Sequence, residues 1–348
     1  MATWRDLAMP RSKEVWRELR GLRTAVGGPV QHDMDRRNVF VSSLEQAQQF
    51  TEAAVGAGAA TRPVQIFYAL SQFGRAIAAS SGLLGKGEWR LTGHGIQTRN
   101  IDASQGLARV AVTPTAKGSF PGVARALGVQ PMEAQRSVSL GELWPLIPEA
   151  QKVPLPNSSG LPALYFSPGG LVYRGDDRWC RLSLSPVPQD VKVRSQVDPL
   201  SVDVFLSRYP SMSGWSHTPD APDSIQWRLQ DSGANELMVF LPSGLDVHAR
   251  DADGRREALE RATFYRGPSD SYVFPEIGDM SGPVHPLLAW WAILFGLSIL
   301  ARYEPESWAG IIDIDDSSAA NAVEHLLEEA IVVIPHLALR AINDVSVC

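Results

Sequence analysis

The hydrophobic pattern near the N-terminus is that of helices. From residue 63 onward, apolar or small residues recur every three or four positions, which is the spacing of one helical face. These positions are Phe67, Leu70, Gly74 and Ile77. Pro63 suits the first turn of this helix. Upstream, the capping-box spacing of Ser42 and Glu45 predicts the start of an alanine-rich helix that ends near residue 60.

The pattern changes between about residue 100 and residue 280. Glycine and proline become frequent and apolar runs become short, which is typical of strands joined by turns. The predicted strands cover residues 164–173, 181–184, 202–206, 225–229 and 237–241. The helical pattern returns after residue 283, and Pro335 is expected to begin the last helix.

This order of elements predicts an α+β protein rather than an alternating α/β protein. We expect helical N- and C-terminal segments that pack together around or beside a β-rich inserted middle region. The expected boundaries are residues 1–99, 100–280 and 281–348. The most apolar stretch, residues 286–301, is shorter than the roughly 20 residues that a membrane span needs, so we interpret it as a buried helix.

Composition narrows the setting of the protein. The chain has 348 residues, of which 44% are hydrophobic and 20% are charged, as in ordinary globular proteins. Its net charge of −6 argues against a protein that coats nucleic acid through a basic face, but it leaves room for one local basic pocket. Two cysteines and a charged N-terminus without an apolar signal core indicate a reducing compartment. We therefore expect a cytoplasmic protein without a transmembrane segment.

The sequence lacks the motifs of several common enzyme classes. It has no C-x-x-C pair, H-E-x-x-H helix, phosphate-binding loop, G-x-S-x-G turn or dinucleotide-binding glycine pattern. Asp313, Asp315 and Asp316 precede a predicted helix, where acidic residues act as caps and as partners of the helix dipole. We therefore expect neither a metal nor a cofactor.

Polar and charged residues form a candidate binding site. They lie on the predicted helix that begins at Pro63, in the loop that follows it, and on the predicted helix near the C-terminus. The candidate ligand-binding residues are Tyr68, Gln72, Arg75, His94, Thr98, Arg99 and Arg302. Arginine forks bind phosphate or carboxylate, and histidine can bind an anion or move a proton near neutral pH. Two structural alternatives stay open. Arg75 and His94 could tie a helix to a loop through buried hydrogen bonds, and Arg302 could form a clamp with Glu304 or Glu306.

Several stretches resemble the YaaC family of bacterial proteins. They are residues 62–76, 91–99, 140–149, 297–308 and 334–339, in the order that the family has them. This resemblance covers most of the chain outside the β-rich middle, and it supplies no catalytic residues.

A shorter stretch is similar to the opening of HEPN-type helical domains. It consists of residues 67–69, Arg75 and the pair His94-Gly95. The similarity implies binding of nucleotides or RNA, and some members of that class are metal-independent RNases. The RNase members carry an arginine followed by a histidine on a later helix, whereas His336 precedes Arg340 in this chain.

Taken together, these patterns favour a regulatory protein without catalysis that binds a nucleotide, an RNA or a protein partner. An enzyme is the first alternative. It would be a metal-independent, HEPN-like RNase with His94 as acid or base, while Arg75 and Arg99 stabilise phosphate charge. The second alternative is a pure protein-interaction module, which would also suit a homo-oligomer.

Overall fold

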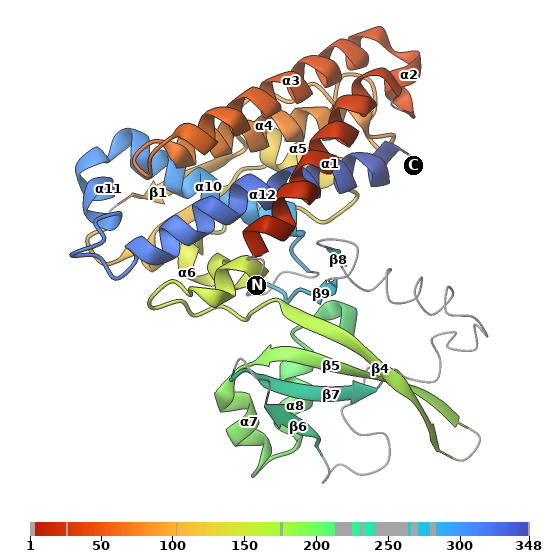
Figure 1. Ribbon diagram of the computed structural model, residues 1–348, viewed down its shortest axis with the longest axis vertical. Helices are drawn as coiled ribbons and strands as arrows, with labels where there is room; N and C mark the ends of the chain where they lie inside the picture. The colour runs from red at the N-terminus through yellow and green to blue at the C-terminus, as the bar shows by residue number, and fades with distance from the viewer. Residues whose placement is uncertain are drawn as a thin grey trace. The chain divides into compact units, whose positions relative to one another are not determined.

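The computed structural model of the chain describes most residues from Trp4 to Ser346 (Figure 1). The described ranges are 4–25, 27–101, 103–174, 177–212, 225–229, 233–240, 264–265, 271–278 and 283–346. Two compact units divide the chain. The first unit combines Met1–Gly160 with His285–Cys348, and the second unit is Leu161–Val284, inserted in the sequence of the first.

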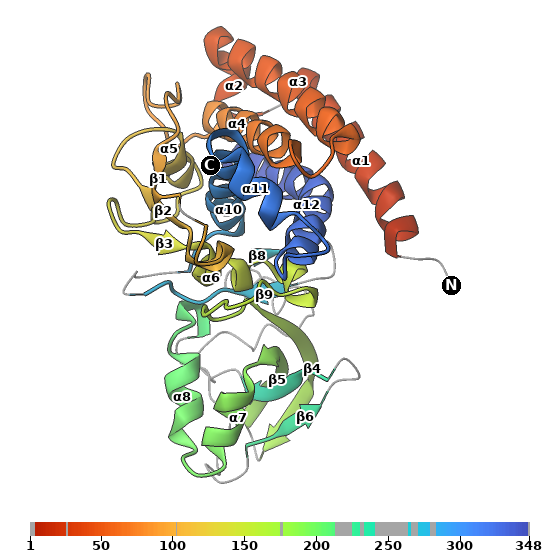
Figure 2. The same ribbon diagram turned by 90° about the vertical axis from the view of Figure 1, so that its left-hand side faces the viewer.

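The first unit is mainly helical. Its helices are α1 (Trp4–Ala25), α2 (Pro29–His32), α3 (Met34–Gly56), α4 (Arg62–Ser80), α5 (Ser119–Ala126), α6 (Leu140–Leu143), α10 (Pro286–Tyr303), α11 (Pro305–Ile311) and α12 (Ala320–Ser346). Helix α4 packs against α3, α10 and α12, which surround it in Figure 2. The N- and C-terminal helices therefore pack together, and the predicted α+β class is confirmed.

Helix α4 is at the centre of this unit because nearly every face of it is apolar or small. Phe67, Leu70, Phe73 and Ile77 are fully buried. A Cβ atom on Gly74 would lie 2.4 Å from the Trp291 ring of α10, so a side chain at this position would push the two helices apart. The periodic pattern of the sequence thus corresponds to a close contact between α4 and α10.

A small antiparallel sheet completes the first unit. Its strands are β1 (Ile96–Asn100), β2 (Ala111–Pro114) and β3 (Val138–Ser139), in the order β1-β2-β3. Short 3₁₀ helices accompany them at Leu107–Arg109, Trp144–Leu146 and Pro148–Lys152. Strands β1 and β2 and helix α6 contact α10, and this packing groups residues 100–160 with the helices. The chain therefore passes from one compact unit to the other at residues 160/161 and 284/285. The division by sequence into residues 1–99, 100–280 and 281–348 stays a prediction.

The second unit contains a six-stranded antiparallel sheet with the order β6-β7-β5-β4-β9-β8. The strands are β4 (Leu164–Arg174), β5 (Asp177–Val187), β6 (Trp227–Leu229), β7 (Asn235–Phe240), β8 (Phe264–Tyr265) and β9 (Ser271–Val273). Two helices, α7 (Gln189–Ser195) and α8 (Leu200–Leu206), and a 3₁₀ turn at Pro210–Met212 belong to the same unit. Leu184, Leu237 and Val273 from the sheet share a core with Val202 and Phe205 from α8.

Most strand predictions in this unit are confirmed, but one is wrong. The predictions at 164–173 and 181–184 fall within β4 and β5, and those at 225–229 and 237–241 overlap β6 and β7. Residues 202–206 form part of helix α8 instead. Val202, Phe205 and Leu206 are buried while Val204 is 68% exposed, which is helical rather than alternating burial.

Two predicted helix ends are also wrong. Helix α3 begins at Met34, and the Asp33 carboxylate caps it by accepting hydrogen bonds from the backbone N–H groups of Asp35 and Arg36. Ser42 therefore lies inside the helix. Pro335 does not begin the last helix but lies within α12, where its missing N–H interrupts one hydrogen bond of a continuous 27-residue helix.

Helix α10 is the most apolar element of the first unit. Among the described residues it is the one helix whose length and composition would suit a membrane span, and 78% of its 18-residue window is buried inside the protein. Burial on all sides is the property expected of a central core helix. This agrees with the interpretation of residues 286–301 as a buried helix.

Candidate functional site

The candidate site begins where α4 and α10 lie side by side. Arg302 occupies the last turn of α10, where the helix dipole favours a cation. Its Nε donates to the Ser298 carbonyl at 3.0 Å, and its Nη1 donates to the Tyr68 hydroxyl of α4 at 3.4 Å. The guanidinium carbon lies 5.9 Å from the centroid of the Tyr68 ring. Two residues that are 234 positions apart in the sequence are thus in direct contact.

His94 is held next to these helices by a rigid loop. The backbone N–H of Phe120 donates to the His94 carbonyl at 2.9 Å, and the Ser119 hydroxyl donates to the Gly93 carbonyl at 2.6 Å. Gly95 has φ +73° and Gly118 has φ +117°, and a Cβ on Gly118 would lie 2.4 Å from the Gly95 Cα. Only glycine allows the two segments to approach this closely. The start of α5 therefore fixes the position of the histidine.

The His94 ring packs between aromatic rings of both helices. Its centroid lies 5.6 Å from that of Phe67 on α4 and 5.8 Å from that of Phe295 on α10. His94 keeps an exposed side, and the burial of the rest of the ring lowers its pKa, as do the positive charges of Arg302 and then Arg75. Both arginines thus lie within electrostatic range of His94, whose ring gains its own charge only on the acidic side of its ordinary range.

The arginines of this cluster have unused hydrogen-bond donors. Arg75 Nε and Arg302 Nη2 are buried and have no hydrogen-bond partner among the described residues. Within the same residues, neither arginine forms an ion pair, so the proposed clamp between Arg302 and Glu304 or Glu306 is not present there. Buried donors are nearly always satisfied in folded proteins. We call Arg75, His94 and Arg302, with Tyr68, the cationic cluster.

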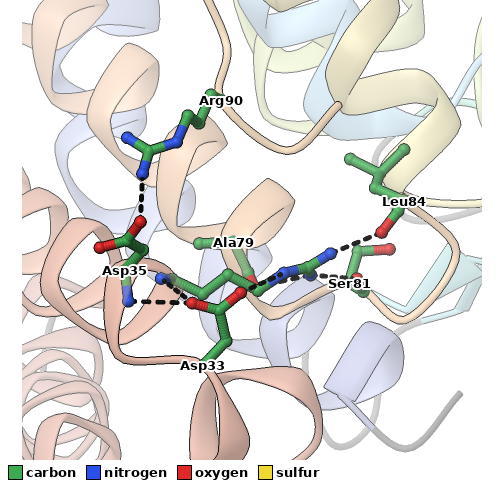
Figure 3. A network of polar contacts seen from close by, with 7 residues as sticks. Asp33, Asp35, Ala79, Ser81, Leu84 and Arg90 are labelled. Atoms are coloured by element: carbon green, nitrogen blue, oxygen red, sulfur yellow. Dashed lines mark hydrogen bonds and ion pairs between the residues drawn. The ribbon is translucent and has the colours of Figure 1, made fainter. Parts of the chain in front are cut away.

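A third arginine of the same unit is itself buried and has very different surroundings. Arg36 lies at the start of α3 and is only 7% exposed. Its guanidinium donates to three backbone carbonyls near the end of α4, and Figure 3 shows the residues that supply them. They are Ala79 at 3.1 Å, Ser81 at 2.8 Å and Leu84 at 2.5 Å. This arginine therefore caps the C-terminal end of α4 by satisfying carbonyl groups there and in the loop that follows.

The other predicted site residues are less well connected to the cluster. Gln72 is buried on α4 between Tyr68 and Arg75. Thr98 is half-buried on β1, where it pairs with Val112 of β2. The side chain of Arg99 lies outside the part of the chain that the structure describes. Of the seven predicted residues, the contacts bring together Tyr68, Arg75, His94 and Arg302.

Aromatic residues next to the cluster were not predicted as site residues. Phe50 of α3 stacks on Tyr68 with centroids 5.5 Å apart, and Tyr303 follows Arg302 at the end of α10. The Arg302 guanidinium lies 5.2 Å from the Tyr303 ring centroid, and Tyr303 is 63% exposed. Its position directly after Arg302 was the signal in the sequence, but a tyrosine at a helix end is common on its own.

The described residues contain no group of three or more His, Cys, Asp or Glu side chains placed to hold a metal ion. The aspartates at 313–316 form a local turn instead, in which the Asp313 carboxylate accepts a hydrogen bond from the backbone N–H of Asp315 at 3.0 Å. Arginine, histidine and tyrosine side chains, as in the cationic cluster, are of the kind that can recognise an anion.

Fold and site together define an α+β protein whose helical core presents a cationic cluster between its N-terminal and C-terminal helices. The chain belongs to the YaaC-like protein family, whose family model matches residues 22–342. Comparison with curated proteins and with solved structures gave no match. The resemblance to YaaC is therefore confirmed, and the similarity to HEPN-type domains stays a prediction.

Proposed function

We propose that this YaaC-like protein is a non-catalytic, regulatory binding protein of the cytoplasm whose ligand carries a phosphate group, as a nucleotide or an RNA does. The proposed binding site is the cationic cluster of Arg75, His94, Arg302 and Tyr68. The observation that carries the proposal is the pair of buried guanidinium nitrogens, Arg75 Nε and Arg302 Nη2, that lack partners among the described residues.

Unsatisfied donors lower the stability of the protein without ligand. A buried polar group without a partner costs roughly 1–3 kcal/mol, and more when it is charged. An anion that accepts hydrogen bonds from both arginines would remove this cost on binding. Phosphate suits the site because it offers several oxygens to donors that approach from α4, from α10 and from the His94 loop.

Binding without catalysis is favoured by what surrounds His94. Cleavage of a phosphoester by general acid–base catalysis needs a group that accepts a proton and one that donates a proton. His94 packs against Phe67 and Phe295 and interacts with arginines, which are hydrogen-bond donors without an acceptor atom. The cluster is therefore better suited to holding a phosphate than to moving its protons.

A thermal-shift experiment tests this proposal. Pyrophosphate, nucleotides and short RNAs are added to the wild-type protein and to the variants Arg75→Met, His94→Gln and Arg302→Met. A ligand at 100 times its dissociation constant should stabilise the wild type by about 2.7 kcal/mol. We expect the three variants to lose this shift.

Lys86→Met is the control, because it removes one exposed positive charge from the loop after α4. It should keep the shift. A shift that survives in Arg75→Met and Arg302→Met would place the ligand elsewhere. Conversion of a bound nucleotide or RNA, lost in His94→Gln, would replace the binding function by the RNase alternative.

A further inference from the structure

Tyr303 extends the cationic cluster towards the surface. It follows Arg302 directly, and the guanidinium of Arg302 lies 5.9 Å from the Tyr68 ring centroid and 5.2 Å from the Tyr303 ring centroid. One arginine therefore connects the buried donors of the cluster to an aromatic ring that is 63% exposed. A ligand bound at Arg302 has this ring within its immediate reach.

The two tyrosines differ in how much of their rings is free. Phe50 stacks on Tyr68 with an interplanar angle of 24°, and Phe67 lies 6.0 Å from it in a tilted arrangement. Tyr68 is therefore packed on several sides and serves to position Arg302. For Tyr303, the one ring contact within the described residues is the guanidinium of Arg302. Its remaining exposed surface offers a stacking platform, and every nucleobase has an aromatic face that can use it.

Charge beyond Tyr303 sets the size of the ligand. The exposed charged residues between positions 304 and 316 are all acidic: Glu304, Glu306, Asp313, Asp315 and Asp316. A longer nucleic acid that continued past Tyr303 would bring its phosphates towards the carboxylates that follow it in the chain, Glu304 and Glu306, and like charges repel. A ligand with its phosphate at the arginines and an uncharged ring at Tyr303 avoids it.

We infer that the ligand is a mononucleotide, with its phosphate in the cationic cluster and its base stacked on Tyr303. This inference rests on the proposed function, because it assumes that the cluster binds phosphate. It adds a residue that selects a nucleotide over other phosphorylated molecules. It also excludes a polymer as the preferred ligand.

The test is a set of affinities measured by calorimetry. The probes are adenosine, guanosine, cytidine and uridine monophosphates, ribose 5-phosphate and a short single-stranded RNA. The wild type should bind at least one mononucleotide about tenfold more tightly than ribose 5-phosphate, the size of one stacked base. It should bind the RNA no more tightly than that mononucleotide.

Variants separate the base from the phosphate. Tyr303→Leu should lose the tenfold preference and keep the affinity for ribose 5-phosphate, whereas Tyr303→Phe should keep both. Equal affinities of the wild type for all mononucleotides and for ribose 5-phosphate, all lost in Arg75→Met, would overturn this inference and leave the phosphate site standing. If the RNA bound more tightly than every mononucleotide, the inference that the preferred ligand is a mononucleotide would be wrong. Absence of binding by every probe would overturn the proposed function together with this inference.

Discussion

The helical unit holds the buried nitrogens of its arginines in two opposite ways. At the start of α3, Arg36 gives its donors to the carbonyls of Ala79, Ser81 and Leu84, so the fold itself uses the guanidinium. At the meeting of α4 and α10, Arg75 and Arg302 keep buried donors without partners in the described part of the chain. Arg36 contributes to stability, whereas the donors of the cationic cluster cost stability unless something else binds them.

All three residues are arginines, so their hydrogen-bond partners, and not the residue type, distinguish an arginine that stabilises the fold from one proposed to bind a ligand. Proteins commonly break a rule of polar satisfaction at functional sites and offset the cost elsewhere. Here the offset comes from the apolar contact of α4 with α10, where Trp291 packs against Gly74 and Phe67. Substitutions that change stability or phosphate affinity can test this contrast between the two arginine environments.

The largest effect is expected where the fold supports His94. Gly118→Ala combines a φ of +117° with a Cβ that would lie 2.4 Å from the Gly95 Cα. Strain and overlap together should lower the free energy of unfolding by about 4 kcal/mol and abolish phosphate binding. Chemical denaturation measures the first effect, and calorimetry with pyrophosphate measures the second.

Gly93→Ala is the matched control for this prediction. Gly93 has φ +66°, but a Cβ there would meet nothing within 4 Å. It should cost only the backbone strain, about 1 kcal/mol. If both variants lose stability equally, the close approach of Gly118 to Gly95 does not hold the loop in the way described.

The next effect sharpens the contrast directly. Arg36→Met leaves three buried carbonyls without their donor and should lower the free energy of unfolding by about 3 kcal/mol, without changing the affinity for pyrophosphate. Arg90→Met is the control, since its ion pair with Asp35 is formed by side chains that are 54% and 69% exposed. That change should cost less than about 1 kcal/mol. A loss of pyrophosphate affinity in Arg36→Met, at temperatures where it is folded, would contradict the structural role.

A third test concerns a half-buried histidine that the fold keeps uncharged. The His285 Nδ1 accepts a hydrogen bond from the Leu287 N–H and caps α10, and burial lowers its pKa from 6.5 to about 4. Between these pH values the unfolded chain binds a proton at this residue and the folded chain does not, so stability falls as the pH falls. The loss at pH 5 should be about 2 kcal/mol relative to pH 7.

Denaturation of the wild type and of His285→Asn at both pH values measures this contribution. Asparagine can keep the helix cap but does not titrate. The variant should lose about 2 kcal/mol less stability between pH 7 and pH 5 than the wild type does. Equal pH dependence in the two proteins would show that His285 is not held neutral by burial.

The smallest effect is expected at His94. Partial burial and the neighbouring arginines lower its pKa, so it gains its charge only on the acidic side of its ordinary range. A bound phosphate would favour the protonated ring, and the affinity for pyrophosphate should rise about fivefold between pH 7.5 and pH 5.5. Because phosphates also titrate in this range, His94→Gln supplies the reference curve. Parallel curves for the two proteins would contradict a role of His94 in anion binding.

Local patterns in the sequence predicted much of the fold. The helical spacing from Phe67 to Ile77 predicted α4, and the apolar composition of residues 286–301 predicted a buried helix, which is α10. The sequence could not distinguish residues 202–206 as helix, because a short apolar run suits either element. It also placed the start of α3 at Ser42, since the preceding Asp33 is an equally good cap without a capping-box partner.

The candidate site was predictable in part for the same reason. Tyr68 and Arg75 share a helix, and His94 lies in the loop that follows it. Arginine and histidine are residue types that bind anions, so the sequence alone suggested an anion site. That Arg302 reaches Tyr68 depends on the packing of α10 against α4, which no local pattern contains. The structural role of Arg36 was missed because its carbonyl partners lie 43 to 48 residues away.

The most direct test of the cationic cluster is a paired measurement on Arg75→Met. Its free energy of unfolding is measured by denaturation without ligand, and its affinity for pyrophosphate is measured by calorimetry. We expect this variant to be as stable as the wild type or more stable by about 1 kcal/mol, because an unsatisfied donor is removed, and to bind pyrophosphate no longer. A variant that loses 2 kcal/mol or more and retains full affinity, a loss on the scale of a broken buried network, would show that Arg75 serves the fold as Arg36 does.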